Sequence, residues 1–103
     1  MRANEIAERL AVDAEGVASY LLPNGKRDGA EWVCGNLDGD PGKSLKVHLR
    51  GTKAGVWKDF AEGSGGDLLG LWMKVNGQNL SEAMRDAKDY LGIRDTDIHR
   101  DRS

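Results

Sequence analysis

The sequence contains few of the features that would place it in an exported or membrane-bound class. Cys34 is the only cysteine among 103 residues, which excludes an internal disulfide bond and fits a reducing, cytoplasmic setting. No apolar run approaches the roughly 20 residues that a membrane-spanning helix requires. The first residues, Met1 to Glu5, lack the apolar segment of a secretion signal. We therefore expect a cytoplasmic protein that does not contact a membrane.

Residue patterns typical of catalytic sites are also missing. The glycine-rich segment 62–67 lacks the Gly-Lys-Ser/Thr ending of a phosphate-binding loop, and Asp67 at its end would repel an anion. Asp67 is better explained as the N-cap of a helix. Ser44, Ser64 and His48 have no spacing that would assemble a nucleophile, a base and an orienting group. We expect a domain without catalytic activity and without a cofactor.

Length and composition fit one small soluble domain. Apolar residues make up 39% of the chain and charged residues 31%, and 103 residues can bury a modest core. We expect residues 1–92 to form this domain. Residues 93–103 are charged and almost without apolar side chains, which predicts a tail or a linker.

Positive charge is concentrated in one part of a chain whose net charge is −2. Residues 41–60 have a local net charge of +4, whereas residues 1–25, 26–40 and 61–103 each have a net charge of −2. Concentrated cations can attract a polyanion even on an acidic chain. A solvated sheet face explains the same pattern equally well, so charge alone does not establish binding.

Apolar spacing and capping residues predict four helices. Asp13 and Asp67 are expected N-caps, and Asn79 with Glu82 has the spacing of a capping box. The helix after Asp67 is apolar on most sides and is expected to be central to the core. The expected helices start near residue 3 and cover residues 14–22, 68–75 and 80–91.

Three segments read as strands, at residues 30–35, 44–50 and 55–60. The second strand alternates apolar and basic side chains, and four residues join it to the third, a length typical of a hairpin. Residues 26–29 read as an exposed basic turn. The predicted fold class is α+β: a small antiparallel sheet of three strands, flanked by two N-terminal and two C-terminal helices.

The hairpin combines cations with aromatic rings. Alternation places Trp57 on the opposite side of its strand from Lys58 and Phe60, so one of the two rings faces outward. Core packing is favoured for either ring, because small domains need aromatic area. An outward ring among lysines would suit the bases and phosphates of a single-stranded nucleic acid.

Two turns flank the hairpin as paired ligands flank a zinc ribbon, at residues 34–38 and 59–62. Structural zinc sites use pairs of cysteine or histidine. Here Cys34 is the one good ligand, while Asp38, Asp59 and Glu62 are weak substitutes. The sequence therefore predicts that apolar packing has replaced the metal.

From Trp32 to Leu91 the chain resembles the zinc-ribbon-type N-terminal domain of bacterial, phage and plasmid DNA primases. The resemblance is carried by Ser44-Leu45-Lys46-Val47, by the segment from Trp57 to Gly65-Gly66-Asp67, and by the two helices that follow. The family's second cysteine pair falls on Asp59 and Glu62, and its first pair falls near Cys34 and Asp38. The resemblance is thus to a zinc-less, degenerate ribbon of phage and plasmid primase or primase–helicase proteins, which carry a Gly-Val-Trp-x-Asp-Phe signature like that of residues 55–60.

This resemblance implies a zinc-ribbon-like sheet and a module that binds single-stranded template DNA in replication, next to a separate primase catalytic domain or helicase domain. It implies no metal and no catalysis within this chain. Carried over by position, Trp57 is the stacking candidate and three further cations contact phosphates at the rim. The strand rows would contribute Lys46, His48, Arg50 and Lys58, and the rim Lys26, Arg27 and Lys53.

Two alternatives remain open from the sequence. The domain could dock a helicase or polymerase through its acidic helices instead of its hairpin. It could also retain a metal through Cys34 and acidic partners.

Overall fold

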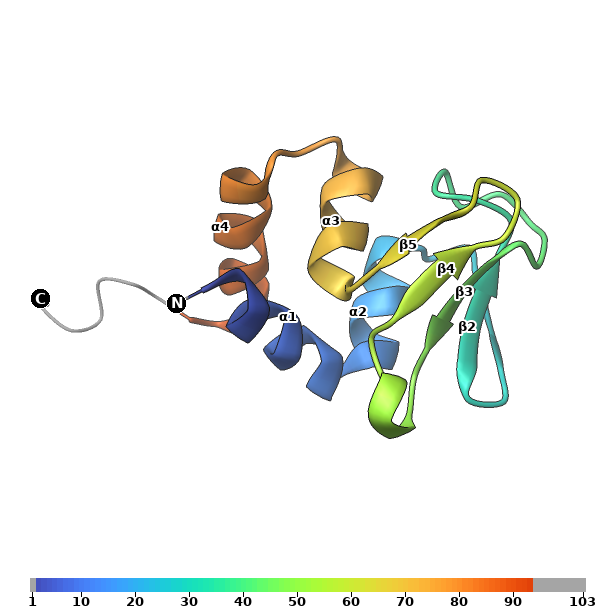
Figure 1. Ribbon diagram of the computed structural model, residues 1–103, viewed down its shortest axis with the longest axis horizontal. Coiled ribbons are helices and arrows are strands. Elements are labelled where there is room, and N and C mark those ends of the chain that lie inside the picture. The colour runs from blue at the N-terminus through green and yellow to red at the C-terminus, as the bar shows by residue number, and fades with distance from the viewer. Residues whose placement is uncertain (1, 94–103) are drawn as a thin grey trace, which may run out of the picture.

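The computed structural model describes residues 2–93, which form an α+β fold with four α-helices and five strands (Figure 1). The tail expected at residues 93–103 lies outside the described residues from residue 94 onward. In chain order the elements are α1 (Ala3–Val12), α2 (Ala14–Leu21), β1 (Lys26–Asp28), β2 (Glu31–Cys34), β3 (Leu45–His48), the 3₁₀ helix η1 (Gly51–Lys53), β4 (Trp57–Asp59), β5 (Ser64–Gly66), α3 (Leu68–Asn76) and α4 (Leu80–Leu91).

All five strands of the described chain form one antiparallel sheet in the order β1-β2-β3-β4-β5. The expectation of three strands is therefore wrong, and the sheet does not match the expected zinc-ribbon-like arrangement. Residues 26–28, expected as a turn, form β1 and pair with β2. The glycine-rich segment before α3 supplies β5, whose Gly65 lies opposite Lys58. A Cβ atom at Gly65 would lie 2.8 Å from the carbonyl oxygen of Trp57, so this close pairing requires glycine.

The four helices begin and end close to the residues that the capping pattern predicts. The Asp67 carboxylate accepts a hydrogen bond from the Gly70 amide at 2.7 Å, which confirms Asp67 as an N-cap. The capping box is confirmed as well: the Glu82 amide donates to Asn79 Oδ1 at 2.8 Å, and the Asn79 amide donates to Glu82 Oε1 at 3.0 Å. Gly92 ends α4 in the left-handed conformation, with φ of 77°.

The helices cover one face of the sheet (Figure 1). α2 contacts β2 and β3, α3 contacts β5, and α1 and α4 pack against α3 and against each other. As expected, α3 is central, because Leu68, Leu71 and Trp72 are fully buried. The inward side chains of the sheet, among them Leu45, join the same core. Throughout residues 2–93, every helix is too short or too polar to span a membrane.

Candidate nucleic-acid interface

The strand register sorts the hairpin side chains between the two faces of the sheet. Leu45 and Val47 of β3 are completely buried against the helices, whereas Lys46 between them is half-buried on the opposite face. β4 alternates in the same way, with Lys58 exposed between two buried residues. Because Lys46 pairs with Lys58, both lysines project from the outer face. The amphipathic character expected of the hairpin is therefore confirmed.

A row of outward-facing residues crosses the whole sheet. Residues paired across neighbouring antiparallel strands share a face, and successive pairs connect one residue of each strand. At the strand spacing of about 4.8 Å, the row extends for roughly 14 Å from β1 to β4. This set, termed the lysine row, consists of Lys26, Val33, Lys46, Lys58 and Gly65.

Phe60 supplies the aromatic ring of this outer face. The ring is 61% exposed, and the Phe60 amide donates a hydrogen bond to the Ser44 carbonyl at 2.7 Å, which ties the residue to the neighbouring chain segment. The Nζ atoms of Lys58 and Lys46 lie 5.4 Å and 6.0 Å from the ring centroid. Both ammonium groups thus make cation–π contacts with the same exposed ring.

Trp57, expected as the stacking ring, is a core residue. It is 1% exposed, and its Nε1 atom donates a hydrogen bond to the Asp67 carbonyl at 2.8 Å. Its partner across the sheet is the fully buried Val47. Because the ring cannot reach a base, the prediction of Trp57 as a surface contact is wrong, and Phe60 is the exposed aromatic of the pair.

His48 projects from the outer face in a neighbouring row that is not cationic. Its strand partner is Glu31, whose own partner is Asp28, so the row combines one histidine with two carboxylates. His48 Nδ1 lies 3.9 Å from Glu31 Oε2. The face is therefore divided between the lysine row and an acidic row, and His48 belongs to the latter.

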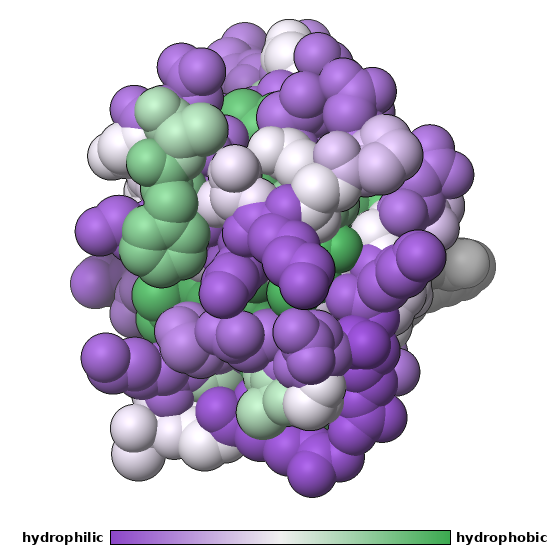
Figure 2. Space-filling view, turned by 90° about the vertical axis from the view of Figure 1, so that its right-hand side faces the viewer, coloured by the Kyte–Doolittle hydropathy of each residue, from purple (hydrophilic) through white to green (hydrophobic). Residues whose placement is uncertain are grey.

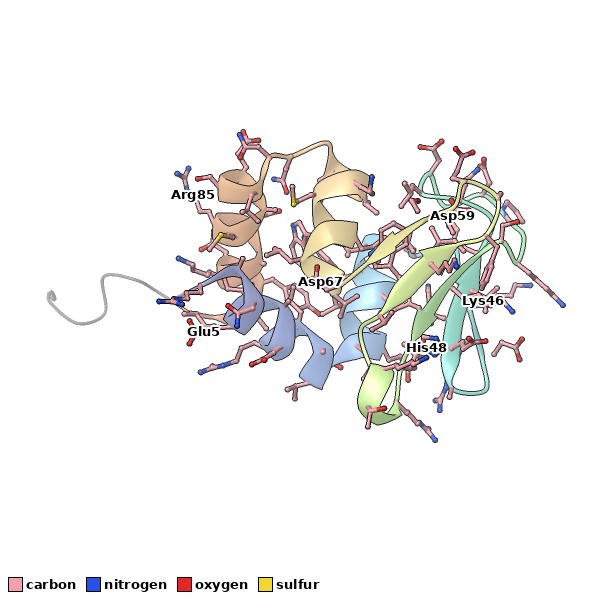
Figure 3. The ribbon with its side chains drawn as sticks, viewed as in Figure 1. Glu5, Lys46, His48, Asp59, Asp67 and Arg85 are labelled. Carbon is pink, nitrogen blue, oxygen red and sulfur yellow. The ribbon has the colours of Figure 1, made fainter. Side chains whose placement is uncertain are left out.

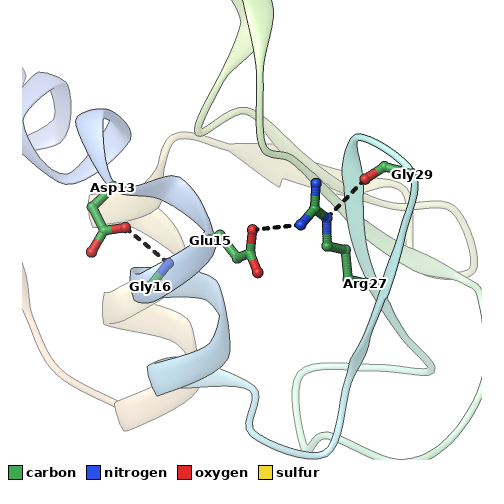
Figure 4. A network of polar contacts seen from close by, with 5 residues as sticks. All are labelled: Asp13, Glu15, Gly16, Arg27 and Gly29. Atoms are coloured by element: carbon green, nitrogen blue, oxygen red, sulfur yellow. Dashed lines mark hydrogen bonds and ion pairs between the residues drawn. The ribbon is translucent and has the colours of Figure 1, made fainter.

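Three other expected contacts lie outside the lysine row. β3 ends at His48, so Arg50 is not in a strand: it precedes η1, and Lys53 is the last residue of η1. Both are exposed on the connection between β3 and β4. Arg27 is held at the other edge, where its Nη1 atom lies 3.4 Å from Glu15 Oε1 and its Nε atom donates to the Gly29 carbonyl at 3.1 Å (Figure 4).

Of the four residues at the expected metal positions, Cys34 and Asp59 are buried, whereas Asp38 and Glu62 are exposed. Asp59 is 1% exposed, and its Oδ1 accepts hydrogen bonds from the amides of Ala61 at 3.0 Å and Glu62 at 3.2 Å. Cys34 donates from Sγ to the Asn36 carbonyl at 3.2 Å. Burial, aided by the charge of Asp59, raises the pKa of the Cys34 thiol. Among residues 2–93 there is no group of three or more cysteine, histidine or acidic residues able to hold a metal ion.

The sheet and the helices occupy opposite ends of the molecule (Figure 3). Lys46 and His48 lie on the sheet, at the end of the molecule opposite Glu5 and Arg85 of the helices (Figure 3). Viewed from the sheet end, the molecule is mostly hydrophilic, with a hydrophobic strip along one side (Figure 2).

The sequence analysis considered Phe60 as an outward ring but did not select it as a contact. It did not predict Val33 and Gly65 as members of the row, because only the strand register places them there.

Neither protein-family models nor curated proteins match this chain.

Proposed function

We propose that this chain is a single-stranded DNA binding module that contacts its ligand through the lysine row and Phe60. The observation that carries the proposal is an exposed ring flanked by two ammonium groups on an uncovered sheet face. Sequence-tolerant binding of single strands needs these two components: cations that follow the phosphates, and aromatic faces on which bases stack.

The shape of the row favours a flexible, unpaired strand. Gly65 lies opposite Lys58 and has no side chain, so no β5 side chain covers Lys58 at this position. Phe60 offers one ring for stacking, which contributes about 1–3 kcal/mol per base. An unpaired base can reach the ring, whereas a base within a duplex is already stacked between its neighbours.

The distribution of charge supports contact at the row and disfavours contact elsewhere. The net charge of −2 provides no general attraction for DNA, so affinity depends on local cations. Lys26, Lys46 and Lys58 make no ion pair within the described residues, whereas Arg27 and His48 face carboxylates. The phosphates of a bound strand would therefore follow the lysines.

The broader hypothesis is that the domain is a zinc-less ribbon of a phage- or plasmid-type primase or primase–helicase. Its support is the local bonding of Asp59, whose carboxylate accepts two amides of its own turn. Both bonds are made by Oδ1 and fix the turn, while the buried Oδ2 atom has no hydrogen-bond partner within the described residues. Catalysis and helicase activity would then lie in other domains.

The test compares two double charge reversals by fluorescence anisotropy with a labelled oligothymidine of about 15 nucleotides. Lys46→Glu with Lys58→Glu alters the row, and Lys74→Glu with Arg85→Glu makes the same change in net charge on the helices. We expect the row variant to bind at least about 30-fold more weakly, equivalent to about 2 kcal/mol, and the helix variant to bind almost normally.

Circular dichroism spectra of the two variants serve as the control that both are folded. Equal losses of affinity in the two variants would mean that only net charge matters, and would overturn the proposal. Absence of binding by the parent protein would also overturn it.

A further inference from the structure

A pocket of about 540 Å³ lies beside the lysine row, between β1 and the loop that joins β2 to β3. Its volume is within the range of sites that hold small organic ligands. Lys26 and Val33 belong both to the pocket and to the lysine row, so the two are continuous. The pocket is lined by Asn24, Lys26, Arg27, Asp28, Val33, Cys34, Pro41, Gly42 and Lys43.

One part of the pocket lining is apolar. Val33 is only 6% exposed, although it projects from the outer face and is not part of the core cluster under the helices. Its neighbours across the sheet are Lys26 and Lys46, and Pro41 lines the pocket from the loop. Pro41 is exposed and Val33 contributes only a small area, and together they form the apolar part of the lining, against which a planar base can pack.

The other part is cationic. Three cations, Lys26, Arg27 and Lys43, line the pocket together with one carboxylate, that of Asp28. Arg27 is already paired with Glu15, whereas Lys26 and Lys43 make no ion pair within residues 2–93. Two ammonium groups are thus available to a phosphate at the pocket.

The loop that walls the pocket is held in shape by its own contacts. Asn36 Oδ1 accepts hydrogen bonds from the amides of Asp38 at 3.0 Å and Asp40 at 3.2 Å. The Gly35 amide donates to the Asp40 carbonyl, and a Cβ atom at Gly42 would lie 2.8 Å from Gly35 Cα. The wall is therefore formed before any ligand binds, which lowers the entropy cost of binding.

We infer that this pocket holds one nucleotide unit, with its base against Val33 and Pro41 and its phosphate at Lys26 and Lys43. This inference rests on the proposed function, because the lysine row would deliver the strand to the pocket. The nucleotide could belong to the bound strand or be a free mononucleotide. The chemistry recognised is the same: a flat ring joined to an anion.

The test follows amide chemical shifts of the isotope-labelled protein on addition of thymidine 5′-monophosphate, inorganic phosphate or oligothymidine. The mononucleotide should shift the amides of Val33, Gly42 and Lys43, and inorganic phosphate should do so only at much higher concentration. Oligothymidine should shift these amides and also those of Lys46 and Lys58. Lys43→Glu should weaken mononucleotide binding about tenfold, and the control Lys74→Glu should leave it unchanged.

The outcomes separate this inference from the proposed function. If oligothymidine shifts the amides of the row but not those of the pocket, and the mononucleotide shifts neither, the pocket assignment is wrong while the proposed function stands. If only the mononucleotide binds, the proposed function is wrong and the pocket is a site for free nucleotides. Equal affinity for phosphate and mononucleotide would show that the base is not recognised, and would overturn the inference.

Discussion

The two aromatic residues at the end of the hairpin should respond to substitution in opposite ways. Phe60 is 61% exposed beside two lysines, whereas Trp57 is 1% exposed and bonded to the Asp67 carbonyl. We predict that Phe60→Ala lowers DNA affinity with little effect on stability. Trp57→Phe should lower stability and leave the affinity of the folded protein unchanged.

The magnitudes follow from these environments. Loss of one stacked base costs about 1–3 kcal/mol, which weakens binding about 5-fold to 150-fold. Removing the exposed ring should change the free energy of unfolding by less than about 1 kcal/mol. In Trp57→Phe, the smaller ring leaves a cavity and the Nε1 hydrogen bond is lost. Together these changes should reduce the free energy of unfolding by about 2–3 kcal/mol.

Urea denaturation gives the free energy of unfolding, and anisotropy with oligothymidine gives the dissociation constant under conditions where each variant is folded. The reasoning is refuted if Phe60→Ala binds as tightly as the parent protein. It is refuted equally if Trp57→Phe is the variant that loses affinity while its stability is preserved.

Two further predictions concern the buried groups near the expected metal positions. Asp59→Ala leaves the amides of Ala61 and Glu62 without their hydrogen-bond acceptor. The variant should have a free energy of unfolding in urea that is lower by about 2–3 kcal/mol. A variant as stable as the parent would contradict the structural role of this carboxylate. The pKa of Cys34 is raised above its ordinary value of 9.0 mainly by burial, so the unfolded chain loses this proton at lower pH than the native protein does. The thiol's contribution to stability should be complete below pH 9.0 and should decline as pH rises from there through the native pKa. Urea unfolding at about pH 8 and about pH 10 gives the change in the free energy of unfolding between the two conditions. The free energy should fall more in the parent protein than in Cys34→Ala, and an equal fall in both would contradict this account.

The helices could be predicted from the sequence because their signals are local. Asp67 and Asn79 mark helix starts through bonds to residues three positions later, and Gly92 marks an end through its own backbone conformation. β1 and β5 carry no such signal. All three residues of β1 are exposed and show no alternation, and two of the three residues of β5 are glycines. β1 and β5 are strands only because they pair with β2 and β4, and the local sequence pattern does not reveal this pairing.

Predicting the candidate site from the sequence would have required the same long-range information on strand pairing. Alternation showed that Trp57 and Phe60 lie on opposite faces, but the face turned to the core depends on the register with β3. A shift of one residue would exchange the two rings. The lysines of β3 and β4 could be identified from sequence alone. Lys26 could be identified as a contact but not placed in their row, because its segment does not read as a strand.

The central claim, that unpaired lysines on the sheet contact the phosphates of a single strand, is tested most directly by the salt dependence of oligothymidine binding. Three phosphate contacts, from Lys26, Lys46 and Lys58, predict a slope of about −2 in a plot of log affinity against log salt concentration. Lys58→Ala should reduce the steepness by about 0.7. A slope near zero, or one that Lys58→Ala leaves unchanged, would contradict the account.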